Sequence, residues 1–426
     1  MPIADWTARA RAGTVRGERM EKDPSPLPSI HRGVTSRNLK GVCFTLEALN
    51  SLATTYYFYY LYFYTKEQFH FNATQNLLLA ALLGFVCMFA AFFGGQFAQK
   101  FGYLTSIQCG AGLMAASFLA CGATGSMRVT AGLATTGIIG MCLTWPAMEA
   151  LVSEGEPRAR LPGLIGFYNV VWAGTAGIAY FTGGAMLQKW GLRSIFYAPA
   201  GLLLVELVLA NWLQKKVLQQ PPAPAAEPLS ALHPVPEGIR SPVPPATFLK
   251  LAWIANPMAY LAINTTVSSI PALAQRLGFS PMQAGFVCSI WLFARAAAFL
   301  ALWLWPGWHY RFRFLAAAYV MLMVSFGAML LVPHPAALVL SQAVLGPALG
   351  LIYFSSLFYS MDVGETKGEH GGIHEAVIGA GNCGGPAVAA AALIFFPTHP
   401  GSGAWAVCLL LTPGLIALYW LRYRKQ

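Results

Sequence analysis

Residues 215–247 read KKVLQQPPAPAAEPLSALHPVPEGIRSPVPPAT, and this proline-rich stretch separates two equal sets of apolar segments. Proline has no backbone N–H and interrupts helices, so the stretch predicts a linker rather than a membrane-spanning helix. A helix that crosses a bilayer needs about 20 mostly apolar residues. Six segments of that kind precede the linker and six follow it, at residues 39–64, 75–98, 103–124, 128–151, 161–186, 193–214, 248–273, 281–305, 312–332, 335–361, 371–396 and 402–422.

The composition indicates that lipid covers most of the protein surface. Of the residues, 56% are hydrophobic and 10% are charged, whereas a soluble domain carries about 25% charged residues. We therefore predict an all-α membrane protein with twelve transmembrane helices in two six-helix bundles, at 38–214 and 248–426. A disordered cytoplasmic tail at 1–37 precedes the bundles, and the linker at 215–247 joins them on the cytoplasmic side.

The positions of lysine and arginine predict the orientation of the chain. Cytoplasmic loops are enriched in both residues. With a cytoplasmic N-terminus, only five of the 27 fall on the opposite side, and Arg295 falls within a segment. We therefore expect both termini in the cytoplasm of a multi-pass protein of the cell (inner) membrane. The net charge of +11 then reflects topology and anionic lipid. We expect no nucleic-acid partner, no cofactor and a monomeric protein.

The stretch GGQFAQKFG, residues 94–102, resembles the cytoplasmic loop motif of the major facilitator superfamily, G-x-L-a-D-[RK]-x-G-[RK]-[RK]. Gly95, Lys100 and Gly102 match this motif, Phe97 stands in place of the leucine, and Gln99 replaces the acidic residue. Together with the six-plus-six arrangement, the resemblance extends over roughly 38–424. It implies a two-bundle transporter that rocks around a central cavity and opens it alternately to each side of the membrane.

The resemblance also implies a latch on the cytoplasmic side. In the family the loop motif pairs with acidic residues at neighbouring helix ends, and the candidates for pairing with Lys100 are Glu149, Glu154 and Glu156. The two halves also repeat each other here, since GEPRARLPG (155–163) aligns with GETKGEHGG (364–372) at a constant offset. The predicted gating or latch residues are Gly95, Lys100, Gly102, Glu149, Glu154, Arg158, Asp362 and Lys367.

Polar side chains within the segments are candidates for lining the cavity, because they are costly in lipid. In the first segment, Glu47, Asn50, Thr54 and Tyr57 recur at a spacing of three or four, which places them on one helix face. The alternative, that individual members are packed polar structure, stays open. The predicted cavity residues are Glu47, Asn50, Thr54, Tyr57, Trp145, Asn169, Trp172, Tyr260, Asn264, Arg295, Tyr353 and Asn382.

Arg295 lies deep in the segment 281–305. A lone arginine at that depth is expensive, so we expect a carboxylate partner or an anionic substrate. Glu375 is the first candidate for the partner, and Glu47 is the second.

His374 and Glu375 open the glycine-rich stretch GGIHEAVIGAGNCGGP, residues 371–386. A zincin would need His-Glu-x-x-His, and Ile378 occupies the position of the second histidine, so this pattern predicts no metal site. His374, Glu375 and Glu47 are instead candidates for proton coupling. The alternative is that His374 caps the segment and that the helix dipole favours Glu375 at its start.

These observations predict a secondary active transporter of a small organic solute, with H⁺ as the expected coupling ion. The phosphate-binding pattern G-x-x-x-x-G-K-[ST] is missing from the sequence, so ATP is not expected to drive transport directly. The expected partners are the solute, the coupling ion and membrane lipid. The alternative is a membrane enzyme or a non-transporting receptor on the same scaffold, although we expect no enzymatic activity.

Overall fold

The structure is a computed structural model that describes residues 34, 37–154, 156, 160–219, 244–363 and 367–424, with side chains at 37–38, 361–363 and 367–371 excepted. Nearly all of the predicted tail at 1–37, and most of the predicted linker at 215–247, lie outside the described residues. The two ends of the predicted linker are helical, because one helix continues to Leu218 and the next begins at Pro245.

Within the described ranges the chain forms helices and no β-strand. The helices are α2 (Arg37–Phe69), α3 (Ala73–Phe101), α4 (Tyr103–Ala123), α5 (Met127–Ser153), α6 (Leu161–Trp190), α7 (Ser194–Leu218), α8 (Pro245–Arg276), α9 (Pro281–Cys288), α10 (Ile290–Leu304), the short 3₁₀ turn η4 (Pro306–Trp308), α11 (Phe312–Leu331), α12 (Pro335–Val363), α13 (Lys367–Phe395) and α14 (Ser402–Tyr423).

Each of the twelve predicted segments corresponds to a helix, with α9 and α10 together forming one of them. Local signals set several of the ends. Asn72 and Gln75 form a reciprocal capping box at the start of α3, and Ser280 and Gln283 form another at the start of α9. Gly102 has φ +95°, a conformation that favours glycine, where α3 ends and α4 begins.

Eleven helices, counting α9 and α10 as one, are long and apolar enough to cross a membrane; α2 falls outside this group. Polar side chains explain the difference, since Glu47, Asn50, Ser51, Thr54 and Thr55 all lie on α2. All five are buried inside the protein, so the helix does not expose them to lipid. By contrast, the exposed side chains of the other helices include many large apolar ones, such as Phe93 and Val208.

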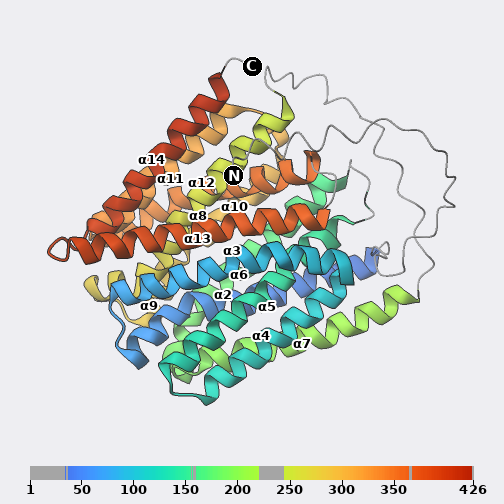
Figure 1. Ribbon diagram of the computed structural model, residues 1–426, viewed down its shortest axis with the longest axis horizontal. Helices are drawn as coiled ribbons and strands as arrows, with labels where there is room; N and C mark the ends of the chain where they lie inside the picture. The colour runs from blue at the N-terminus through green and yellow to red at the C-terminus, as the bar shows by residue number, and fades with distance from the viewer. Residues whose placement is uncertain are drawn as a thin grey trace, which may run out of the picture.

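The two halves of the chain lie against each other, with α3 and α13 running side by side along their boundary (Figure 1). Glycines permit this close approach. A Cβ atom at Gly84 of α3 would collide with the backbone of Asn382 and Cys383 in α13, and one at Gly379 of α13 would collide with the backbone of Met88. This boundary is therefore a contact between two helix backbones.

A second contact between the halves joins α6 to α9 and α10. A Cβ atom at Gly184 would collide with the carbonyl oxygen of Pro281, and one at Gly166 would collide with the side chain of Trp303. Small residues at both boundaries thus allow close packing between helices that are far apart in the sequence and belong to different bundles.

Candidate functional site

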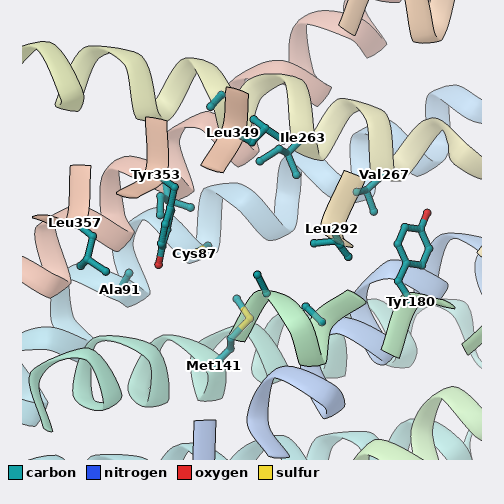
Figure 2. Close-up of a cluster of buried hydrophobic side chains, with 14 of the residues drawn as sticks. Cys87, Ala91, Met141, Tyr180, Ile263, Val267, Leu292, Leu349, Tyr353 and Leu357 are labelled. Atoms are coloured by element: carbon teal, nitrogen blue, oxygen red, sulfur yellow. The ribbon is translucent and has the colours of Figure 1, made fainter. Parts of the chain in front are cut away.

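A cavity of about 90 Å³ lies between the two halves and is lined by α2, α5 and α6 from the first and by α8, α10, α12 and α13 from the second. Figure 2 shows buried hydrophobic side chains from both halves, among them Met141 and Tyr180 of the first and Ile263 and Tyr353 of the second. The predicted residues that line the cavity are Glu47, Thr54, Trp145, Trp172, Tyr260, Arg295, Tyr353 and Glu375. Residues that the sequence did not indicate also line it, including Ser51, Phe58, Tyr59 and Tyr168.

An adjoining cavity of about 110 Å³ shares a wall with the first one. The shared residues are Phe58, Tyr59, Trp145, Tyr260 and Ile263. The predicted cavity residues Asn264 and Asn382 line this second space, and the Asn264 amide donates a hydrogen bond of 2.8 Å to the carbonyl oxygen of Asn382.

Asn50, Tyr57 and Asn169 were predicted to line the cavity, but they lie in the packed interior of the first half. Asn50 donates to both carboxyl oxygens of Glu206 at 3.1 Å and accepts from the indole of Trp145. Tyr57 stacks on Phe118 with ring centroids 3.9 Å apart. Asn169 is fully buried, and neither polar atom of its side chain has a hydrogen-bond partner.

The geometry of α2 explains why only part of the predicted stripe faces the cavity. Successive helix positions are separated by about 100°, so residues four apart lie closer to one line than residues three apart. The cavity-facing line runs through Glu47, Ser51, Thr54 and Phe58. Asn50 and Tyr57 are rotated to one side of that line and face the helices of their own half.

Arg295 is surrounded by aromatic rings. Its guanidinium carbon lies 4.6 Å from the ring centroid of Trp172 and 4.8 Å from that of Tyr353, with Phe299 and Tyr260 at 5.4 and 5.9 Å. The side chain is 2% exposed, and its Nη2 donates to the Tyr260 hydroxyl at 3.4 Å. These contacts place the cation against four π-faces.

The expected ion pair of Arg295 with Glu375 or Glu47 is not formed, because no carboxylate oxygen in the described part of the chain lies within 4.0 Å of its nitrogens. The Nε atom of Arg295 is buried without a hydrogen-bond partner. Aromatic rings occupy the positions around the guanidinium that a carboxylate would need. The positive charge is therefore stabilised by π-faces and one hydroxyl, and it retains a free donor.

Glu149, His374 and Glu375 form a cluster in which one ligand atom from each lies within 4.8 Å of the others. Glu149 comes from α5 in the first half, and the other two come from α13 in the second. The three residues are 5%, 0% and 3% exposed. Glu149 was predicted as a latch residue, but its side chain lies in the cavity, where its Oε1 accepts a hydrogen bond of 3.2 Å from Tyr353.

Glu47 is also buried and lines the cavity, together with Arg295, Glu149 and Glu375. Its Oε1 accepts a hydrogen bond of 2.7 Å from Ser51, one turn further along α2, and Tyr168 is a second hydrogen-bonding neighbour of the carboxyl. The cavity thus holds one arginine and three carboxyl groups, Glu47, Glu149 and Glu375.

Of the three acidic candidates for pairing with Lys100, Glu156 pairs with a different lysine. Lys100 is exposed, lies 5.2 Å from the ring centroid of Phe101 and forms no ion pair with any described carboxylate. Lys40, at the start of α2, instead pairs with Glu156 and donates to the carbonyl oxygen of Val152. Lys40 was missed because the sequence places it next to a tail rich in similar basic residues.

The remaining latch residues divide into three groups. Gly95 lies against Gly372 at the α3–α13 boundary, where a Cβ atom at Gly372 would be 3.0 Å from the Gly95 Cα atom. Glu154 accepts a hydrogen bond of 3.5 Å from the Tyr103 hydroxyl. Arg158 and the side chains of Asp362 and Lys367 lie outside the described residues.

Comparison with known proteins identifies the fold. A family model described as the Major Facilitator Superfamily matches residues 43–386, whereas no curated protein matches the chain. The solved structure of the human organic anion transporter MFSD10 (TETRAN) is similar, with 13% identity and a TM-score of 0.66, over 91% of this chain and 100% of that one. A single-site mutant of the nucleoside transporter NupG has 14% identity and a TM-score of 0.63, over 90% and 99%. The matched family is one of transporters, and the two similar structures share its fold.

Proposed function

The chain belongs to the major facilitator superfamily, and from that premise we propose that it is a secondary active transporter that carries a small organic anion together with protons. The observation that carries this proposal is the state of Arg295. This cation is buried in the cavity between the halves, and no described carboxylate lies within 4.0 Å of its nitrogens.

A carboxylate or similar anionic group on the substrate supplies the missing partner of Arg295. A buried charge without a counter-charge is costly, and a guanidinium binds carboxylates through two parallel hydrogen bonds. The Nε atom, which has no hydrogen-bond partner among the described residues, is available as one of these donors. The rings of Trp172, Tyr260 and Tyr353 suit an apolar or aromatic body on the same substrate. The printed description of MFSD10 as an organic anion transporter supports this substrate class.

Proton coupling follows from the carboxyl groups that share the cavity. When Glu47, Glu149 and Glu375 are all ionised, their negative charges outnumber the single arginine and repel an anion. When they carry protons, that repulsion is removed. The anion and the protons therefore bind favourably together, which is the requirement for moving both in the same direction.

Alternating access supplies the route. The cavity is lined by both halves, and its charged side chains are at most 5% exposed. A solute enters or leaves only when the two halves separate at one end. The glycine contacts at the α3–α13 and α6–α9 boundaries allow such rocking, because small residues let the helix backbones approach closely.

The test is uptake of radiolabelled organic anions, including aromatic carboxylates, by proteoliposomes with an imposed pH gradient. We expect uptake to rise when the side holding the substrate is made acidic, and Arg295→Gln to abolish it. Arg313→Gln is the matched control, because Arg313 is exposed at the start of α11. Uptake that ignores the pH gradient, or that survives in Arg295→Gln, would contradict the proposal.

A further inference from the structure

We infer that Glu149, His374 and Glu375 bind a divalent transition-metal ion such as Zn²⁺ across the boundary between the two halves. This inference goes beyond proton-coupled transport and does not depend on it, because metal binding is measured on the purified protein without any substrate.

The first argument is that the cluster is incomplete as it stands. Oε2 of Glu149, Nε2 of His374 and Oε2 of Glu375 are all buried and have no hydrogen-bond partner in the described part of the protein. Buried polar atoms are nearly always hydrogen-bonded, so three such atoms in one cluster call for a ligand. Carboxylate oxygen and imidazole nitrogen are the atoms through which glutamate and histidine coordinate metals.

The second argument is that the other atoms of the same side chains are held in place. Nδ1 of His374 lies 3.0 Å from the Ser356 hydroxyl, and Oε1 of Glu149 accepts from the Tyr353 hydroxyl. Both hydroxyl groups come from α12. Hydrogen bonds of this kind fix the orientation of metal-binding side chains and leave the opposite atom free for the metal. His374 is oriented so that Nε2, rather than Nδ1, is the free nitrogen.

The third argument is charge. Two ionised carboxylates and a neutral imidazole carry a charge of −2, which a divalent cation cancels. The guanidinium of Arg295 does not pair with either carboxylate, because it lies among aromatic rings. An imidazole ligand favours Zn²⁺ and its first-row neighbours, whereas Mg²⁺ and Ca²⁺ prefer sites made only of oxygen.

The distances are compatible with this assignment after a small adjustment. Zinc bonds of about 2.1 Å in a tetrahedral site place ligand atoms about 3.4 Å apart. One ligand atom from each residue lies within 4.8 Å of the others, and Nε2 of His374 lies 4.0 Å from Oε1 of Glu375. Side-chain rotations that draw these atoms together by roughly 1.5 Å or less complete the site. Glu149 and Glu375 line the cavity, so a fourth coordination position faces the space that the substrate would occupy.

The metal would also join the two halves of the molecule, since α5 belongs to the first and α13 to the second. Binding therefore favours the conformation in which these helices are close together.

The experiment is calorimetric titration of the detergent-purified full chain with Zn²⁺ alone. We expect one saturable site per chain, and at least a tenfold loss of affinity in His374→Gln and in Glu149→Gln. The matched controls are His399→Gln and Glu67→Gln, both exposed, which should leave the affinity within twofold. Mg²⁺ should not compete. A site that survives in His374→Gln, that is lost in His399→Gln, or that Mg²⁺ fills equally well would overturn the inference.

A second measurement on the unchanged protein does not depend on how the variants fold. Co²⁺ in place of Zn²⁺ should give a visible absorption band that reports nitrogen ligation at four coordination, and Zn²⁺ should displace it. Absence of that band in the wild-type chain would also overturn the inference. Zn²⁺ binding without anion uptake would contradict only the proposed transport function. Anion uptake without Zn²⁺ binding would contradict only the metal site.

Discussion

Two regions of the molecule bury carboxyl groups in different ways. In the packed interior of the first half, Glu206 is fully buried, and both of its oxygens accept hydrogen bonds from the Asn50 amide. In the cavity, Glu149 and Glu375 are almost as deeply buried, but each leaves an oxygen without a partner. A buried charge that only supports the fold is satisfied by its neighbours, whereas one that binds a ligand is left incomplete until the ligand arrives.

The largest effect should come from removing the incomplete carboxyls. In the double variant Glu149→Gln/Glu375→Gln, we expect accumulation of the anion against its gradient to fall by a factor of at least about 10, which corresponds to about 1.4 kcal/mol. The dependence of uptake on pH should flatten, because only Glu47 of the three cavity carboxyls remains to take up a proton. Exchange of labelled for unlabelled anion should persist.

Both quantities are measured in proteoliposomes, with uptake recorded from pH 5 to 8. If the double variant still accumulates the anion in response to a pH gradient, the unpartnered carboxyls of the cavity do not take part in coupling, and their contrast with Glu206 is wrong.

Breaking the satisfied pair should damage the fold instead. Asn50→Ala leaves the buried Glu206 carboxyl without its donor, which should cost about 2 kcal/mol of unfolding free energy. Thermal unfolding of the purified variant should show the loss as a lower melting temperature, and the surviving folded protein should keep its pH profile. Asn50→Ser is the milder control, because its hydroxyl still offers a donor. A changed pH profile with unchanged stability would reverse the roles given to the two regions.

The aromatic surroundings of Arg295 should have an intermediate effect. Trp172→Ala removes the nearest ring, at 4.6 Å, and a buried cation–π contact contributes about 1–2 kcal/mol. The KM for the anion should change about 5- to 30-fold, measured from initial uptake rates. Trp172→Phe retains a π-face and should lie between the variant and the wild type. An unchanged KM in Trp172→Ala would show that this ring does not position the guanidinium.

The smallest effect should come from removing the hydroxyl group of Tyr353, a residue that contacts both Arg295 and Glu149. Its ring faces Arg295, and its hydroxyl donates to Glu149. Tyr353→Phe keeps the ring and deletes the hydrogen bond, which is worth about 1 kcal/mol. We expect the midpoint of the pH profile to move while KM for the anion stays within about twofold. A change in KM with a fixed midpoint would mean that the hydroxyl serves the anion instead.

The sequence was sufficient for the helices, because apolar length is a local property. The predicted segments 103–124 and 312–332 differ from α4 and α11 by one residue at their ends. Arg295 and Glu47, predicted as cavity residues, and Glu375, predicted for proton coupling, all line the cavity, since a charge within an apolar segment has few other places to lie.

The contacts between the halves could not be predicted from local patterns. Glu149 meets His374 only because α5 and α13 pack together, and nothing in either segment indicates that partner. The motif His-Glu-x-x-His requires both histidines on one helix, and Ile378 occupies the second position, so the motif does not indicate a ligand from another helix. On α2, the spacing identified a polar stripe but not which edge of it faces the cavity, so Asn50 and Tyr57 were misplaced.

The contact of Gly372 with Gly95 offers a means of trapping one conformation. The atoms that a new methyl group at 372 would meet belong to the opposing backbone, so no side-chain rotation can make room for it. Gly372→Ala would disfavour the close approach of α3 and α13 near Glu375, because the backbone of α3 must shift to admit the methyl group. A single methyl group leaves every charged side chain in place. Such a variant would therefore change the fraction of open molecules without changing the residues that bind the solute.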